Sequence, residues 1–377
     1  LSVKMRIGQR VVYQENHRSD SVSNVIDDVL LPLLHASVAS NVVLQEIPII
    51  QETTWQRLFE IAAKQGVLAL LYEVICQLPE SVQPPRMLKL RWALSVEAIE
   101  RRYEQQIQVV HELSELYGNQ GIRSIVLKGI GLSVYYPRPE HRECGDIDLL
   151  LDDYIKGNEI IERLGITVNR NNEKHAVFYY KGVMVENHCN LLAFSHHKTE
   201  KLINEFLNEE AEHCLRVADG GYYLPSPMFN VLYLLRHMAR HFGIEGINLR
   251  ILLDWGLFLR NNRHQIDFDK IQSLCAACGY EAVYDIFTEL AGELIGEDFT
   301  SLLVNRPDVL VKRRVWNDIL NFGFHRESSS KRGVRFVRKC RKIFSCRWKY
   351  QLLLPESFWR DIVYPSLVLH LRHPQEI

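Results

Sequence analysis

The sequence predicts an α+β fold in which a small mixed sheet is flanked by N-terminal and C-terminal helical regions. Three observations lead to this prediction. Across residues 54–119, apolar side chains recur every three or four positions, which is the period of an amphipathic helix. Across residues 121–190 that period gives way to short β-branched runs, which are typical of strands. After Pro225 and Pro227 the helical period returns and continues toward the end of the chain.

These changes of pattern divide the chain into three expected regions. They are an N-terminal helical region at residues 1–119, an α/β core at residues 120–224 and a C-terminal helical region at residues 225–377. In the core we expect strands at residues 122–127, 146–151, 175–181 and 183–190, with helical segments at 129–135 and 157–164. In the outer regions we expect helices at residues 86–117, 228–241, 248–261, 268–278, 282–294 and 332–354.

The composition of the 377-residue chain excludes several classes of protein. A formal net charge of −1 argues against attraction of the whole surface to nucleic acid. No apolar run reaches the roughly 18 to 20 residues that a membrane span needs. The eight cysteines are scattered through apolar stretches, which is typical of reduced thiols rather than of a disulfide framework. We therefore expect a cytoplasmic protein without a membrane partner.

Cys275 and Cys278 have the spacing of half a zinc site. The nearest cysteines on either side, Cys214 and Cys340, are far away in sequence and have no partner at metal-ligand spacing. Buried thiols are therefore the better interpretation of this pair.

The main candidate for chemistry is the segment around Asp146, Ile147 and Asp148. Because side chains alternate along a strand, the two aspartates point to one face while Ile147 points into a core. Two carboxylates on one face of an apolar strand are unfavourable unless a cation lies between them. Mg²⁺ prefers such oxygen ligands and keeps other positions for water and phosphate, with Mn²⁺ as an alternative ion.

A third carboxylate comes from a neighbouring strand. Glu186 and His188 share one face of residues 183–190, whereas Val183 and Val185 share the other. If the acidic faces of the two strands meet, Asp146, Asp148 and Glu186 can hold two metal ions, which activate an acceptor oxygen and stabilise a leaving pyrophosphate. A solvent-exposed pair of aspartates on an edge strand is the alternative.

Four motifs occur in order along this part of the chain. They are Leu127-Lys128-Gly129, Tyr135-Tyr136-Pro137-x-Pro139, Arg142-x-x-Gly145-Asp146-x-Asp148 and Val185-Glu186-x-His188. Together they resemble the uncharacterised bacterial nucleotidyltransferases of the DNA polymerase beta superfamily. Softer similarity extends through His237-x3-His241 and Arg250-x3-Asp254.

The resemblance implies a polymerase-beta-type sheet in which Asp146 and Asp148 bind both metals and Glu186 binds the catalytic one. Two departures put activity in doubt. The superfamily usually has Gly-Ser or Gly-Gly where this chain has Lys128-Gly129, so Lys128 replaces a phosphate-binding serine as a point charge. The third carboxylate is more often aspartate than glutamate.

The remaining candidates surround this centre. Gly129 is expected to open a helix whose amides face the nucleotide phosphates, with an ordinary turn glycine as the alternative. Gly145 is expected to lie beside the phosphates. Arg142 is expected either to contact phosphate or to form a salt bridge with Glu140 or Glu143. His188 is a candidate for binding the acceptor, and His175 is a weaker one.

Two pairs of residues in the C-terminal region are candidates for lining the cleft. His237 and His241 share one helical face, and buried, hydrogen-bonded histidines are the alternative. Arg250 and Asp254 are spaced for an intrahelical ion pair, but the resemblance favours a place in the cleft.

The predicted function is transfer of a nucleoside monophosphate from a nucleoside triphosphate, ATP included, to a hydroxyl. The acceptor is a small molecule, a protein side chain or an RNA end, and protein modification by a toxin–antitoxin-type enzyme is the runner-up. A catalytically inactive nucleotide-binding or scaffold relative is the alternative of another class. RNA would bind through the basic segment 332–349, which contains Arg332, Arg335, Arg338, Lys339, Arg341, Lys342, Arg347 and Lys349.

Overall fold

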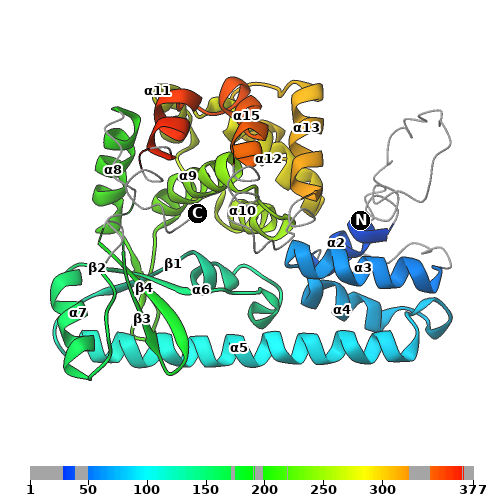
Figure 1. Cartoon of the computed structure of the whole chain (residues 1–377), viewed down its shortest axis with the longest axis horizontal. Helices are drawn as coiled ribbons and strands as arrows, with labels where there is room; N and C mark the ends of the chain where they lie inside the picture. Colours follow the sequence, from blue (N-terminus) through cyan, green and yellow to red (C-terminus); the bar gives the residue numbers. More distant parts are fainter. Residues whose placement is uncertain are drawn as a thin grey trace.

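A computed structural model of the chain describes residues 29–38, 50–170, 175–189, 191, 198–218, 220–321, 340–366 and 368. Figure 1 shows a sheet that lies between one long helix, α5, and a group of C-terminal helices. The predicted α+β class is confirmed, since the described residues form one six-stranded mixed sheet flanked by helical regions.

The sheet has the order β3-β4-β2-β1-β6-β5. Its strands are β1 (Ser124–Leu127), β2 (Ile147–Leu151), β3 (His175–Tyr180), β4 (Val183–His188), β5 (Leu215–Arg216) and β6 (Tyr223–Leu224). β2 pairs antiparallel with β1 and parallel with β4. The four predicted strands are confirmed, although β2 begins at Ile147 and Asp146 lies just before it. β5 and β6 were not predicted, because two residues are too few to show an alternating pattern.

The hairpin between β3 and β4 turns at Lys181 and Gly182, between the two strands expected at residues 175–181 and 183–190. Lys181 and Gly182 both have left-handed backbone angles, with φ of 49° and 81°. Two consecutive residues of this kind form the tight turn whose twist matches that of the flanking strands. The turn fixes the register of the hairpin, so His175 of β3 lies opposite His188 of β4.

The two faces of the sheet have different neighbours. One face packs on α5 (Arg86–Gly118) and α7 (Tyr154–Arg163) through a hydrophobic cluster that includes Ile147, Leu149 and Val185. Because side chains alternate, Asp148 and Glu186 point to the opposite face. That face is turned toward α9 and α10, as Figure 1 shows.

The helical regions share a second hydrophobic cluster. It joins side chains of α4, the strand β1 and α10, for example Leu71, Leu127 and Leu252. The N-terminal helices are α2 (Leu31–Val38), α3 (Glu52–Gln65) and α4 (Leu68–Gln77), and the short α6 (Lys128–Ser133) follows β1. The C-terminal helices are α8 (Lys198–Ala211), α9 (Pro227–Ile244), α10 (Leu249–Asn262), α11 (Phe268–Cys278), α12 (Glu281–Ile295), α13 (Val309–Leu320) and α15 (Arg347–Leu352).

Local signals explain where the helices next to the sheet begin. Ser226 caps α9 by accepting a hydrogen bond from the amide of Phe229, and Pro227 occupies the first turn, where no amide donor is needed. Asn248 caps α10 in the same way. α8 and α13 were not predicted from the sequence. Within the described ranges, none of the helices combines the length and the apolar character that crossing a membrane requires.

The expected helix at residues 332–354 is only partly within the described residues. In the described part the helix is interrupted by a turn at Cys346, so a continuous helix is wrong there. Lys349 is buried and pairs with Asp318 at 2.6 Å, and Trp348 packs on Phe242. Lys349 is therefore part of the core and does not face a polyanion. The residues of this basic segment from Arg332 to Lys339 lie outside the described residues.

We predict that Gly131→Ala lowers the free energy of unfolding by about 1–3 kcal/mol, because overpacking forces the backbone to shift. A Cβ at this position of α6 would lie 2.5 Å from the carbonyl oxygen of Val126. Denaturant unfolding of the full chain measures the change. Gly118→Ala, near the end of α5, is the control because its Cβ would meet nothing within 4 Å. Equal stability of the two variants would contradict the close approach of α6 to β1.

Candidate functional site

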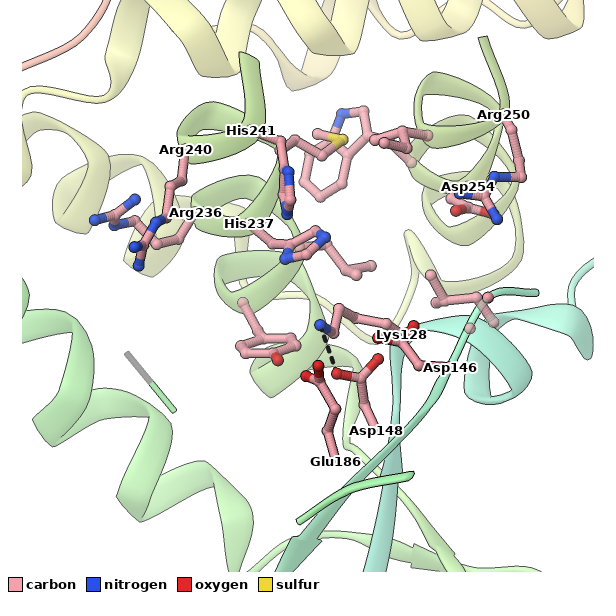
Figure 2. Close-up of a pocket in the computed structure, with 18 of the residues that line it drawn as sticks. Lys128, Asp146, Asp148, Glu186, Arg236, His237, Arg240, His241, Arg250 and Asp254 are labelled. Carbon is pink, nitrogen blue, oxygen red and sulfur yellow. Dashed lines mark ion pairs between the residues drawn. The ribbon is translucent and has the colours of Figure 1, made fainter. Parts of the chain in front are cut away.

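A cavity of about 500 Å³ lies between the sheet and the helices α9 and α10. Its floor is formed by the ends of β1, β2 and β4, and its other walls by α9 and α10 (Figure 2). All the residues that the sequence marked as candidates line it, namely Lys128, Gly129, Arg142, Gly145, Asp146, Asp148, Glu186, His188, His237, His241, Arg250 and Asp254. His175 lines it as well.

Three carboxylates converge on the floor of the cavity. Parallel pairing of β2 with β4 places Asp148 opposite Glu186, and Asp146 comes just before β2. One oxygen of each carboxylate lies within 4.8 Å of an oxygen of the others. Oxygen ligands in such an arrangement are those that Mg²⁺ or Mn²⁺ prefers. These three side chains could therefore hold a divalent metal.

Asp148 is the most buried of the three carboxylates. The ammonium Nζ of Lys128 lies 2.8 Å from its Oδ1, and Nε2 of His188 donates a hydrogen bond of 2.8 Å to the same oxygen. Burial raises the pKa of Asp148. The charge of Lys128 and the hydrogen bond from His188 together lower it by more than burial raises it, so the pKa lies well below its usual range. Asp148 is therefore ionised and already paired with a cation.

Glu186 is in the opposite electrostatic situation. Burial and repulsion by Asp148 and Asp146 raise its pKa to about 7. Nδ1 of His175 lies 3.3 Å from Glu186 Oε2, and Nε2 of His188 lies 3.6 Å from it. The three carboxylates thus have less positive charge around them than their full ionisation requires. A divalent cation would supply the missing charge, so the donor set fits a metal ion.

Lys128 reaches the carboxylates from an unusual backbone. Its φ is 44°, and Gly129 next to it has φ of 23° and ψ of −110°. A lysine with positive φ is uncommon and marks a strained position. Gly129 therefore does not open a regular helix, as was expected, but bends the chain between β1 and α6 so that the ammonium of Lys128 points into the cavity (Figure 2).

Arg142 has a different partner from the one expected. Its Nε and Nη2 donate to the two oxygens of Asp254 at 2.9 and 2.7 Å, and both side chains are buried. The hydroxyl of Tyr136 donates to Asp254 as well, at 2.6 Å. The expected salt bridge to Glu140 or Glu143 is wrong, because Arg142 pairs with Asp254 instead. Glu140 pairs with Arg138. A bidentate pair shielded from water is stronger than a single exposed contact.

Arg250 and Asp254 both line the cavity, which is the place that the resemblance favoured for them. The alternative, an ion pair along α10, is wrong, since Asp254 pairs with Arg142 and Arg250 donates to the backbone carbonyl of Glu143. The carbonyl of Gly145 accepts hydrogen bonds from Arg102 and Gln106 of α5, at 3.0 and 2.8 Å. The loop that precedes Asp146 is therefore held from both sides, by α10 and by α5.

One face of α9 forms the wall opposite the carboxylates. His237 and His241 lie on it with ring centroids 4.4 Å apart, and the pKa of His237 is well below its usual range because of burial and the nearby charge of Lys128. Tyr233, Arg236 and Arg240 line the same wall and were missed. Tyr233 and Arg240 lie four and three residues from His237, and Arg236 lies three residues from Tyr233 and four from Arg240, so the helical period contained the signal.

The two cysteines with zinc spacing are buried thiols. Cys275 and Cys278 lie in the hydrophobic core of the C-terminal helices, and burial raises the pKa of both. Among the described residues, neither belongs to a group of side chains that could hold a metal ion. This observation agrees with the interpretation from the sequence.

Comparison with known families gives one match. A family model described as "uncharacterised nucleotidyltransferase" matches residues 51–296. The matched range contains the whole sheet and all the cavity-lining residues named above. Comparison with curated proteins and with solved structures gives no match.

We predict that the protein binds Mn²⁺ more tightly as the pH rises toward 7. The pKa of Glu186 is raised to about 7, so below that pH a cation must displace a proton to bind. The affinity should rise by up to about tenfold per pH unit and level off above the pKa. Calorimetric titration of the metal-free protein measures it. In Glu186→Gln the dependence should flatten, and an equally steep dependence in that variant would contradict the assignment.

We also predict that Arg142→Met lowers the free energy of unfolding by about 3–5 kcal/mol, because it leaves a buried carboxylate without its cation. The additional change Asp254→Leu should restore part of the loss, since it removes that carboxylate. Denaturant unfolding measures both. Arg101→Met is the control, because Arg101 and Glu97 form an exposed pair at 3.7 Å whose loss should cost less than about 1 kcal/mol. Similar losses in the two single variants would contradict the prediction.

Proposed function

The chain belongs to the family of uncharacterised nucleotidyltransferases, and we propose that it transfers a nucleoside monophosphate from a nucleoside triphosphate to an acceptor hydroxyl, with release of pyrophosphate. The observation that carries the proposal is the convergence of Asp146, Asp148 and Glu186 within 4.8 Å in one cavity. Transfer of this kind requires positioning and neutralisation of charge more than covalent chemistry from the protein.

Asp146 and Asp148 are proposed to hold two Mg²⁺ ions together, with Glu186 completing the site for one of them. Bound Mg²⁺ would neutralise the charge that develops on the phosphate oxygens and on the leaving pyrophosphate. The support lies in the residues themselves, because burial and, after it, repulsion by Asp148 and Asp146 raise the pKa of Glu186. A cation removes that repulsion.

Glu186 is proposed to receive the proton of the acceptor hydroxyl. The acceptor oxygen then forms a bond to the α-phosphorus, and the bond between the α-phosphorus and the bridging oxygen to the β-phosphate breaks. Pyrophosphate leaves with the electron pair of that bond.

Lys128 is proposed to be the phosphate ligand in place of the superfamily's serine. Its ammonium now lies against Asp148, where it stands in for part of the positive charge of a metal ion. If a metal ion neutralised Asp148, the ammonium of Lys128 would be released to contact a phosphate oxygen of a nucleotide in the cavity that Lys128 and Asp148 line. His188 keeps Asp148 in place through its hydrogen bond.

The proposal favours an enzyme over an inactive scaffold. A scaffold has no need for Glu186 to point at Asp146 and Asp148, because that arrangement raises the electrostatic energy of the protein. A cavity of about 500 Å³ is also within the range of small-molecule sites. Both features fit a nucleotide and an acceptor that meet above the carboxylates.

We predict that isothermal titration detects binding of ATP or another nucleoside triphosphate only in the presence of Mg²⁺. Asp146→Asn/Asp148→Asn should weaken this binding at least about tenfold, because it removes two metal ligands. Glu97→Gln is the control, since Glu97 lies on the exposed side of α5 and its ion pair within the described part of the chain is with Arg101.

Two results would count against the proposed function. One is the absence of binding for every nucleotide in folded protein. The other is metal-dependent binding that the double variant leaves unchanged. Once binding is found, release of pyrophosphate on addition of candidate acceptors identifies the acceptor.

A further inference from the structure

Arg240 differs from the other arginines around the cavity. Arg142 is paired with Asp254, Arg236 is paired with Glu200, and Arg250 donates to the carbonyl of Glu143. Among the residues that the structure describes, Arg240 has no hydrogen bond and no ion pair. Its side chain is nevertheless half-buried and lines the cavity. A guanidinium in this position has lost water without gaining a carboxylate.

The nearest acidic groups do not fill this role. Glu356 accepts a hydrogen bond from the hydroxyl of Tyr280 at 2.7 Å and lies 3.6 Å from Arg236. Glu245 lies 3.6 Å from Nδ1 of His241. Burial lowers the pKa of Arg240, which shows that loss of water outweighs the attraction of these two carboxylates. The charge of Arg240 is therefore left for a group that enters the cavity.

The surroundings of Arg240 suit an anion. Arg236, His237 and His241 lie on the same face of α9, and no carboxylate of the floor belongs to this helix. In Figure 2, Arg236 and Arg240 lie to the left of the three carboxylates, of which Glu186 is the nearest to them in this view and Asp146 the farthest. The cavity thus has three carboxylates on its floor, whereas the wall formed by α9 presents the guanidinium of Arg240, which has no ion pair among the described residues.

We propose that Arg240 and the adjoining face of α9 form an anion subsite that takes a phosphate group of a substrate. This inference rests on the proposed function, since it names a second contact for the substrates of the same cavity. An arginine fork matches the oxygens of a phosphate, and such a charge-assisted contact is strong where water is excluded. The phosphate belongs either to the end of the nucleoside triphosphate or to an acceptor that carries one.

The first test uses no metal, so it does not depend on the proposed reaction. Asp146→Asn/Asp148→Asn protein is titrated with pyrophosphate in the presence of EDTA. We expect binding, because two negative charges have been removed and the wall of α9 is intact. Adding Arg240→Ala should weaken this binding at least tenfold, Arg240→Lys should weaken it less, and the exposed Arg101→Ala should leave it unchanged.

The second test identifies the source of the phosphate. Wild-type protein and Arg240→Ala are titrated with ATP and with AMP in the presence of Mg²⁺. A tenfold loss for ATP without a loss for AMP assigns the subsite to the terminal phosphates. An unchanged affinity for ATP, with pyrophosphate still binding to the ATP-saturated protein through Arg240, assigns it to the acceptor.

Both outcomes support the subsite. It is overturned if pyrophosphate does not bind in the first test, or if Arg240→Ala binds pyrophosphate as tightly as its parent. Thermal unfolding of each variant shows that it is folded. Failure of the proposed function would look different, because ATP would then not bind to the wild-type protein at all while the metal-free result would stand.

Discussion

Repulsion between Asp148 and Glu186 is the constraint on which the candidate site depends. The two strands that carry them are parallel neighbours, and their register sets the two residues opposite each other. Ile147, Leu149 and Val185 on the other face are fully buried against α5 and α7. Burial of each such side chain stabilises the fold by about 1.5–3 kcal/mol, so the strands cannot shift register to separate the carboxylates.

The positive charge near each carboxylate differs between Asp148 and Glu186. Lys128 and His188 both contact Asp148, which is the most buried, whereas within the described part of the chain the ion pairs of Glu186 are with the imidazoles of His175 and His188. The pKa values of the two carboxyl groups are therefore moved in opposite directions. Such a division of protonation between neighbouring carboxylates is typical of sites where one group stays charged and another exchanges a proton.

The carboxylates could be predicted from the sequence because their arrangement follows from the strand period alone. Asp148 and Glu186 each alternate with aliphatic residues, and this local pattern fixes which face they occupy. The partner of Arg142 could not be predicted, because Asp254 is 112 residues away and only tertiary packing brings the two together. Local spacing instead suggested Arg250 as the partner of Asp254, and the buried bidentate contact replaced that pair.

The elements that were missed have equally physical reasons. β5 and β6 are two residues long, so their place in the sheet comes from pairing with each other and with β1 rather than from their own sequence. Arg236 and Arg240 were missed for another reason, since the helical spacing around His237 and His241 was visible but carried no carboxylate or motif to mark it.

The cavity is formed partly by the sheet and partly by α9, and this division affects which residues can determine substrate specificity. The floor is built from backbone-paired strands, and changes there disturb the register that holds the carboxylates. The wall is one face of α9, whose backbone hydrogen bonds lie within the helix, so its side chains can change without moving the floor. Selection of a substrate is therefore expected to depend on α9 and its neighbours, while the proposed metal-binding chemistry depends on the sheet.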